Sequence, residues 1–122
     1  MKKTIQIGDK SVDFVSNGAT PIFYTIIMGE DYLKNFNDWS TDKMNKSEAL
    51  MFMYKVAYVM HVQAKSSNPA KHSKAAFYKW LSQFENMDMM LALEEIAGVY
   101  TGEENLGELV TAKNPDGPPQ ES

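Results

Sequence analysis

Two histidines and two pairs of adjacent glutamates are the residues of this sequence best suited to acid–base or metal chemistry. His61 and His72 stand eleven residues apart, a spacing that matches no HExxH-type metal motif. The glutamate pairs, at 94–95 and 103–104, are sequence neighbours, which do not face one another on a helix and so are poor acid and base partners. We therefore expect structural histidines and a solvated glutamate face.

Other common catalytic motifs are missing from the sequence as well. The chain has no cysteine, which excludes a thiolate nucleophile, a disulfide framework and a cysteine-based zinc site. Gly18 and Gly29 are isolated, so there is no dinucleotide fingerprint and no phosphate loop, and no serine lies in a GxSxG turn. The sequence therefore predicts a protein that is not an enzyme and that binds no cofactor and no metal.

Charge argues against a nucleic-acid partner, and hydropathy argues against a membrane. The formal net charge is −4, and all 12 basic residues are lysines. Arginine supplies the fork that binds guanine edges and phosphates, although its absence also follows from AT-rich codon usage. The longest apolar stretch, residues 49–62, is shorter than the roughly 20 residues that span a bilayer, and no apolar run follows Lys2 and Lys3 as in a signal peptide. We expect a cytoplasmic protein.

The most unusual feature of the composition is its nine methionines. Methionine is flexible and polarisable, which suits surfaces that bind more than one shape, but it also fills gaps in cores. Aromatic side chains can anchor an interface, although in a small domain they also pack in the core. On these grounds the candidate protein-binding residues are Met51, Tyr54, Tyr58, Met60, Trp80, Met89 and Met90.

A mainly α-helical fold must position these candidates. Period-two alternation on both sides of Gly8-Asp9 predicts a β-hairpin over residues 1–16, which must lie on a larger body because an isolated hairpin is marginally stable. Apolar residues at helical spacing over residues 20–101 predict a small bundle of about four to five helices. We expect helices with Thr20 as the N-cap of the first, and with later starts at Asp31, near Asn45 or Ser47, near Ser73 and, after a bend over 85–88, near Met89.

The helix predicted from about Asn45 is apolar almost all round. Twelve of the 14 residues 49–62 are hydrophobic. A helix that is apolar on every side is buried on every side, so this one is either a central core helix or a helix shared with a partner. We expect its apolar surplus to leave one face for a partner to cover, and to favour self-association of the free protein.

The last 20 residues are expected to form a flexible tail behind a single domain of residues 1–102. In the segment 103–122 the only large apolar residues are Leu106, Leu109 and Val110, and a stretch with three prolines follows. Such a segment cannot bury enough surface to offset an ordering cost of roughly 1–2 kcal/mol per residue.

The order of several weak motifs is similar to that of a known protein family. After the hairpin come GATPIFY at 18–24, MGEDYL at 28–33, the apolar helix around AYVM at 57–60, FYKWLSQFE at 77–85, and a short polar tail that contains proline. Over about residues 3–102 this order resembles the tail assembly chaperones of long-tailed phages that infect low-GC Gram-positive bacteria.

The resemblance implies a function that periodicity does not show. Chaperones of this family bind the tape measure protein, keep its apolar helices soluble and help recruit tail tube protein in the host cytoplasm during virion assembly, and they are absent from the mature virion. Many also have a longer form made by ribosomal frameshifting. Here the codons of Ala112-Lys113-Asn114 can contain a slippery run, and the gene sequence at that place decides whether they do.

Two other functions are compatible with the sequence. A small structural virion protein of the tail or neck would share the size, the composition and the lack of cysteine, and its presence in purified particles would distinguish it from a chaperone. A small acidic regulator that blocks a host protein would be encoded away from tail genes. An enzyme ranks last because so few catalytic residue types are present.

Overall fold

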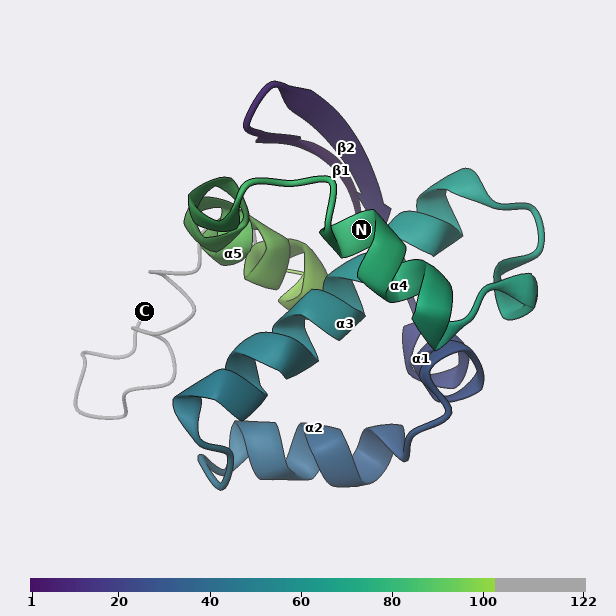
Figure 1. The fold of residues 1–122 in the computed structure, drawn as a ribbon. Helices are drawn as coiled ribbons and strands as arrows, with labels where there is room; N and C mark the ends of the chain where they lie inside the picture. The colour runs from purple at the N-terminus through teal and green to yellow at the C-terminus, as the bar shows by residue number, and fades with distance from the viewer. Residues whose placement is uncertain (103–122) are drawn as a thin grey trace.

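The structure, a computed structural model, describes residues 1–102, in which a β-hairpin precedes five α-helices (Figure 1). The strands are β1 (Lys2–Ile7) and β2 (Lys10–Val15). The helices are α1 (Thr20–Met28), α2 (Tyr32–Ser40), α3 (Lys46–Lys65), α4 (Lys74–Leu81) and α5 (Asn86–Thr101), with a 3₁₀ turn, η1 (Pro69–Lys71), between α3 and α4. The predicted mainly α fold with its N-terminal hairpin is confirmed. The predicted tail, residues 103–122, lies outside the described residues.

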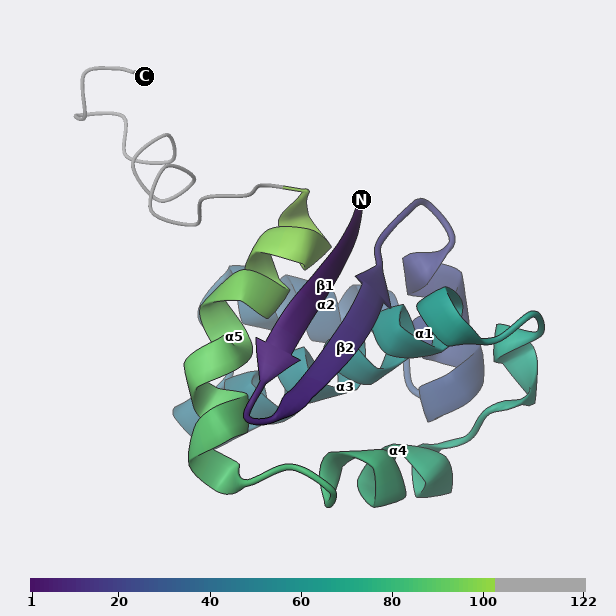
Figure 2. The ribbon, with the colours of Figure 1, turned by 90° about the horizontal axis from the view of Figure 1, so that it is seen from above.

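The hairpin covers the helices with one apolar face. The two strands pair antiparallel with Ile5 opposite Val12, and because side chains alternate along a strand, Ile5, Ile7, Val12 and Phe14 all point inward and are buried. Seen from above, β2 lies over α3 and β1 lies beside α5 (Figure 2). The hairpin that would be marginal alone is thus stabilised by burial against two helices.

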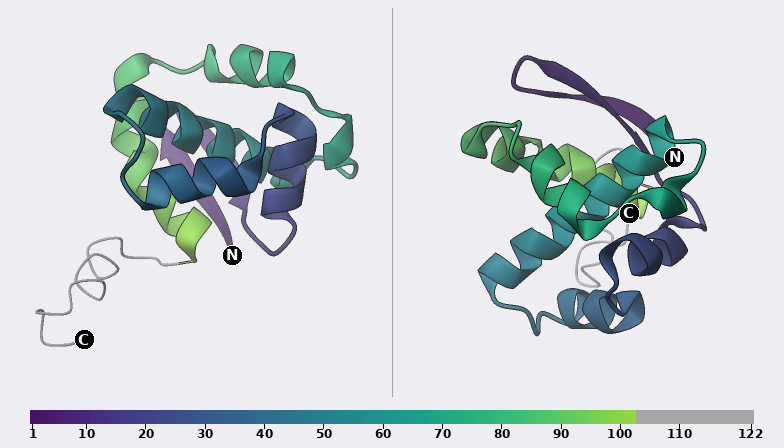
Figure 3. Two further views of the ribbon diagram at one scale, coloured as in Figure 1. Left: turned by 90° about the horizontal axis from the view of Figure 1, so that it is seen from below. Right: turned by 45° about the vertical axis from the view of Figure 1, so that its right-hand side comes forward.

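α3 is the central element of the fold. It begins with a capping box, in which the Asn45 side chain accepts from the Glu48 backbone N–H at 2.8 Å and the Glu48 carboxylate accepts from the Asn45 N–H at 2.9 Å. It ends at Lys65, and the following Ser66 takes an extended conformation as the C-cap. The hairpin lies on one side of α3 and α2 on the other, with α1 and α5 flanking it (Figures 1 and 3).

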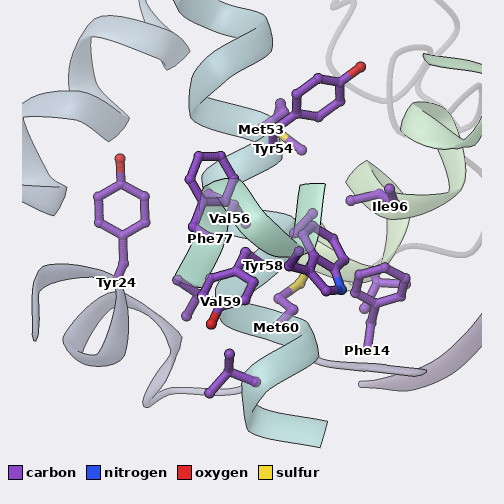
Figure 4. Close-up of a cluster of buried hydrophobic side chains, with 14 of the residues drawn as sticks. Phe14, Tyr24, Met53, Tyr54, Val56, Tyr58, Val59, Met60, Phe77 and Ile96 are labelled. Atoms are coloured by element: carbon purple, nitrogen blue, oxygen red, sulfur yellow. The ribbon is translucent and has the colours of Figure 1, made fainter. Parts of the chain in front are cut away.

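One hydrophobic core joins the hairpin to all five helices. The buried side chains around the middle of α3 include Val56, Val59 and Met60, and they meet Phe14 from β2 and Ile96 from α5 (Figure 4). A second concentration of aromatic rings lies at the start of α3, where Phe52 contacts Tyr24, Tyr32, Trp39 and Tyr100 at ring-centroid distances of 5.5–6.4 Å.

Two predicted helix starts differ from the structure. Thr20 lies inside α1 and not at its N-cap, because its hydroxyl donates to the Gln63 side chain at 2.7 Å instead of capping the helix. α5 starts at Asn86, three residues before the predicted Met89, and the expected bend over 85–88 is its first turn. An acidic residue at Asp88 favours this earlier start because carboxylates stabilise helix N-termini.

Candidate protein-binding surface

Both histidines have structural partners. His61 stacks on the Trp80 ring at a centroid distance of 5.4 Å and donates from Nδ1 to the Asp13 carbonyl oxygen at 3.0 Å. Burial lowers the pKa of His61 below its ordinary value, which favours the neutral imidazole. His72 Nδ1 lies 3.2 Å from the Tyr58 hydroxyl. Within residues 1–102, no three His, Asp or Glu side chains are grouped so that they could hold a metal ion.

The structure places five of the seven candidate binding residues in the core. Tyr54, Tyr58, Met60, Trp80 and Met89 are each less than 9% exposed. The remaining two, Met51 and Met90, are 37% and 42% exposed and lie on α3 and α5, respectively. The candidates therefore do not form one common surface in this fold.

Several elements of the same chain together cover the middle of α3. On one side of α3, Tyr58 packs against Phe77 and Trp80 of α4 at ring-centroid distances of 5.8 and 5.5 Å. The other sides of α3 are packed by β2, α1 and α5. From Phe52 to Met60 every side chain is buried except Lys55, which is partly buried. The expectation that α3 leaves an apolar face for a partner is therefore wrong for this stretch, because α4 and the hairpin already cover it.

Uncovered apolar side chains gather instead at the start of α5. Met87, Met90 and Leu91 are 59%, 42% and 77% exposed, and their spacing of three and four residues puts them on one helical face. We call these three residues the α5 apolar face. Of the three, only Met90 is among the binding residues expected from the sequence.

The sequence contained a signal for the other two members of the α5 apolar face. Met89 and Ile96 are both buried and mark the inner stripe of α5. Positions one and two residues away from an inner stripe point outward. A large apolar residue at such a position, as at Met87 and Leu91, therefore marks surface and not core.

Two smaller pairs of exposed apolar residues lie on α1 and α2. Ile22 and Ile26, four residues apart on α1, are 61% and 51% exposed. On α2, Leu33 is 74% exposed, while Phe36 is 37% exposed because its ring stacks on Tyr32 at 5.7 Å. These pairs contain no methionine, so their side chains are less flexible than those of the α5 apolar face.

A hollow separates the end of α3 from α4. This α3–α4 groove has a volume of about 600 Å³ and is lined by Tyr58, His61, Val62, Lys65, Ser66, His72, Ala76, Lys79, Trp80 and Gln83. Its floor is apolar and aromatic, and its charged groups are basic. It is suited to noncovalent binding of a group that is apolar on one side and acidic on the other.

Neither the hydropathy of the helices nor similarity to known proteins assigns a function to these surfaces. No helix in residues 1–102 combines the length and the apolar character needed to cross a membrane. No family model, no curated protein and no solved structure matches this chain.

Proposed function

We propose that this protein is a phage tail assembly chaperone, which binds the tape measure protein, keeps it soluble and helps recruit tail tube protein while tails assemble in the host cytoplasm. The observation that carries the proposal is the α5 apolar face, Met87, Met90 and Leu91, which the fold leaves exposed. The order of motifs over residues 3–102 supports the same family.

The α5 apolar face has the properties that a client-binding surface needs. It presents anchors at helical spacing, to which an amphipathic client helix can align. Two of its three residues are methionines, whose flexible side chains adapt to successive segments of a long client. Each Met or Leu that becomes fully covered contributes at most about 1.5–3 kcal/mol, so one contact is weak enough to be released when the tail tube assembles.

Co-expression with a candidate tape measure protein tests the proposal. The test variant carries Met90→Gln and Leu91→Gln, and the matched control carries Ile22→Gln and Leu33→Gln, which replace exposed apolar residues on α1 and α2. We expect the α5 variant to unfold at nearly the wild-type temperature but to bind the client about tenfold more weakly, a loss of about 1.4 kcal/mol.

The outcome separates the proposal from its alternatives. Equal client binding by wild type, α5 variant and control would exclude the α5 apolar face as the binding site. Purified virions should lack the protein if it acts as a chaperone. Its stoichiometric presence in washed particles would identify it instead as a small structural protein of the tail or neck.

A further inference from the structure

Two successive stretches of the folded domain carry charge of opposite sign. Residues 49–81, which contain most of α3 and all of α4, have five lysines, both histidines and no Asp or Glu. Residues 82–102, which contain α5, have four carboxylates and no basic residue. The domain therefore has a basic part and an acidic part that are built on different helices.

The α3–α4 groove lies in the basic part. Its two lysines, Lys65 on α3 and Lys79 just before the end of α4, are both exposed. Lys65 shares its charge with the Asp13 carboxylate at 3.3 Å, whereas Lys79 makes no ion pair among the described residues. The Tyr58 and Trp80 rings form part of the lining. The groove is therefore an aromatic hollow whose lysines have too few carboxylates near them.

The α5 apolar face has carboxylates beside it. Glu94 continues the face along the helix, because it follows Met90 by four residues and Leu91 by three. Asp88 precedes Leu91 by three residues. Glu94 is exposed, and neither carboxylate makes an ion pair within residues 1–102. The outer side of α5 thus combines apolar side chains with acidic charge that its own domain does not neutralise.

The α5 apolar face and the α3–α4 groove also match in length. From Met87 to Glu94 the helix rises through seven positions, and the groove residues from Tyr58 to Lys65 on α3 span seven as well, which is roughly 10 Å in each case. The apolar side chains match the aromatic lining of the groove, and the carboxylates match its lysines. An amphipathic helix that lies in an apolar groove is a recurring mode of recognition.

The α5 helix of the same chain does not occupy the groove. None of the residues that line the groove belongs to α5. The inner side of α5 is fixed, because Met89, Ala92 and Ile96 are buried in the core and the helix packs against β1 and α3. The short segment 82–85 joins α5 directly to α4 (Figure 2). α5 would have to leave the core to enter its own groove, so the match joins two copies of the chain.

We propose that the α3–α4 groove of one copy binds the α5 apolar face of a second copy, with the apolar side chains against its aromatic lining and Glu94 beside its lysines. Each copy uses a different surface, so the contact is heterologous. One helix face buries little area, so the association is weak and reversible. In the free protein the contact shields the α5 apolar face from water. That a client displaces the second copy is a consequence that rests on the proposed function.

Analytical ultracentrifugation of the full-length protein alone tests the contact without any client. We expect the average mass to rise with protein concentration, and the association to weaken in about 0.5 M salt because the charges are screened. Lys79→Glu should weaken the association about tenfold, because it brings like charges together. Lys71→Glu is the matched control, since Lys71 is also exposed but does not line the groove, and it should change the association less than about twofold.

Mixing two variants shows whether the two surfaces bind each other. The α5 variant, Met90→Gln with Leu91→Gln, has an intact groove, and Lys79→Glu has an intact α5 apolar face. Each variant alone should associate about tenfold more weakly than wild type. When the ¹⁵N-labelled α5 variant is mixed with unlabelled Lys79→Glu, the Trp80 indole signal should shift, because the intact groove of one binds the intact face of the other.

Three results would overturn the proposal. One is a wild-type protein that stays monomeric up to about 1 mM, where even a very weak contact forms. If Lys79→Glu then weakens client binding, the groove belongs to an acidic client. Another is self-association that Lys79→Glu leaves unchanged, which would indicate that two α5 faces pair with each other. The third is a mixture in which the Trp80 signal does not shift.

Failure of the proposed function would look different. In that case the mixed variants would bind each other as expected, while wild type and the α5 variant would bind the tape measure protein equally.

Discussion

The Lys55 ammonium donates to the Glu30 carboxylate at 2.8 Å, and both side chains are mostly buried between the first and third helices of the fold. The same carboxylate pairs with Lys74 at the start of α4 and accepts from Asn35 in α2 at 3.1 Å and from the Tyr24 hydroxyl in α1, also at 3.1 Å. Glu30 thus ties together four helices whose apolar contacts alone would leave their relative positions less defined.

Replacing Glu30 should make the protein less stable and change its response to acid. Burial by itself raises the pKa of Glu30, but hydrogen bonds from Lys55 and Lys74 outweigh burial and lower the pKa to about 2. Because the folded-state pKa lies below the unfolded value, this stabilisation is present above about pH 4.5 and is lost as pH falls towards 2.

Urea unfolding of Glu30→Gln at pH 7 measures this effect. We expect a loss of about 1–3 kcal/mol, below the value for a fully buried pair because water partly screens the site. Asp38→Asn is the matched control, since it breaks an exposed pair with Lys34 at 3.1 Å and should cost at most about 0.5 kcal/mol. Equal losses in the two variants would show that Glu30 has no special role.

Protonation of His61 should lower the free energy of unfolding at a less acidic pH than protonation of Glu30 does. Burial lowers the pKa of His61 in the folded protein, so the unfolded chain binds more protons once pH drops below the ordinary histidine value of about 6.5. Stability should therefore be complete above that pH and decrease as pH falls through the folded-state pKa. Unfolding curves from pH 7.5 to 5 should show a smaller decrease for His61→Gln, and an identical decrease would refute the assignment.

Gly8→Ala should destabilise the contact between the hairpin and α5. Gly8 has φ +62°, which L-residues rarely adopt, and a Cβ there would lie 2.4 Å from Oδ2 of Asp88. We expect a loss of about 1–3 kcal/mol in thermal or urea unfolding. Gly18→Ala is the control, because a Cβ on Gly18 would have no atom within 4 Å and its φ is not positive, so the change should be nearly neutral.

Two methionines of α3 should respond very differently to truncation. Met60 is fully buried and Met51 is 37% exposed, so Met60→Ala leaves a cavity and should cost about 2–5 kcal/mol, whereas Met51→Ala should stay within about 1 kcal/mol. Chemical denaturation of both variants checks the expectation. Similar losses would mean that the start of α3 is as enclosed as its middle.

Removing the Tyr54 hydroxyl should stabilise the protein. That oxygen is buried and has no hydrogen-bond partner among the described residues, and an unsatisfied buried hydroxyl costs about 1–3 kcal/mol. Tyr54→Phe should therefore raise the melting temperature. Tyr24→Phe should lower it, because the Tyr24 hydroxyl bonds with Asn35 at 3.0 Å and with Glu30. A destabilised Tyr54→Phe would indicate a partner that binds this hydroxyl.

Local features of the fold could be predicted from the sequence because residues close in the chain determine them. The alternation of Ile5 and Ile7 identified the inward face of the hairpin. Asn45 and Glu48 have the spacing of a capping box and form one at the start of α3. Gly29 tolerates the left-handed conformation that ends α1. Each depends on steric or hydrogen-bonding preferences within a few positions.

Only the tertiary structure decided which of the candidate methionines remain exposed. Met60, Met89 and Met90 are chemically identical and all lie on helices, yet the first two are in the core and the third is 42% exposed. The difference arises because the hairpin, α1, α4 and α5 pack around α3, while nothing in residues 1–102 covers the outer side of α5. Such coverage depends on contacts between distant segments, and one sequence does not specify them through local preferences.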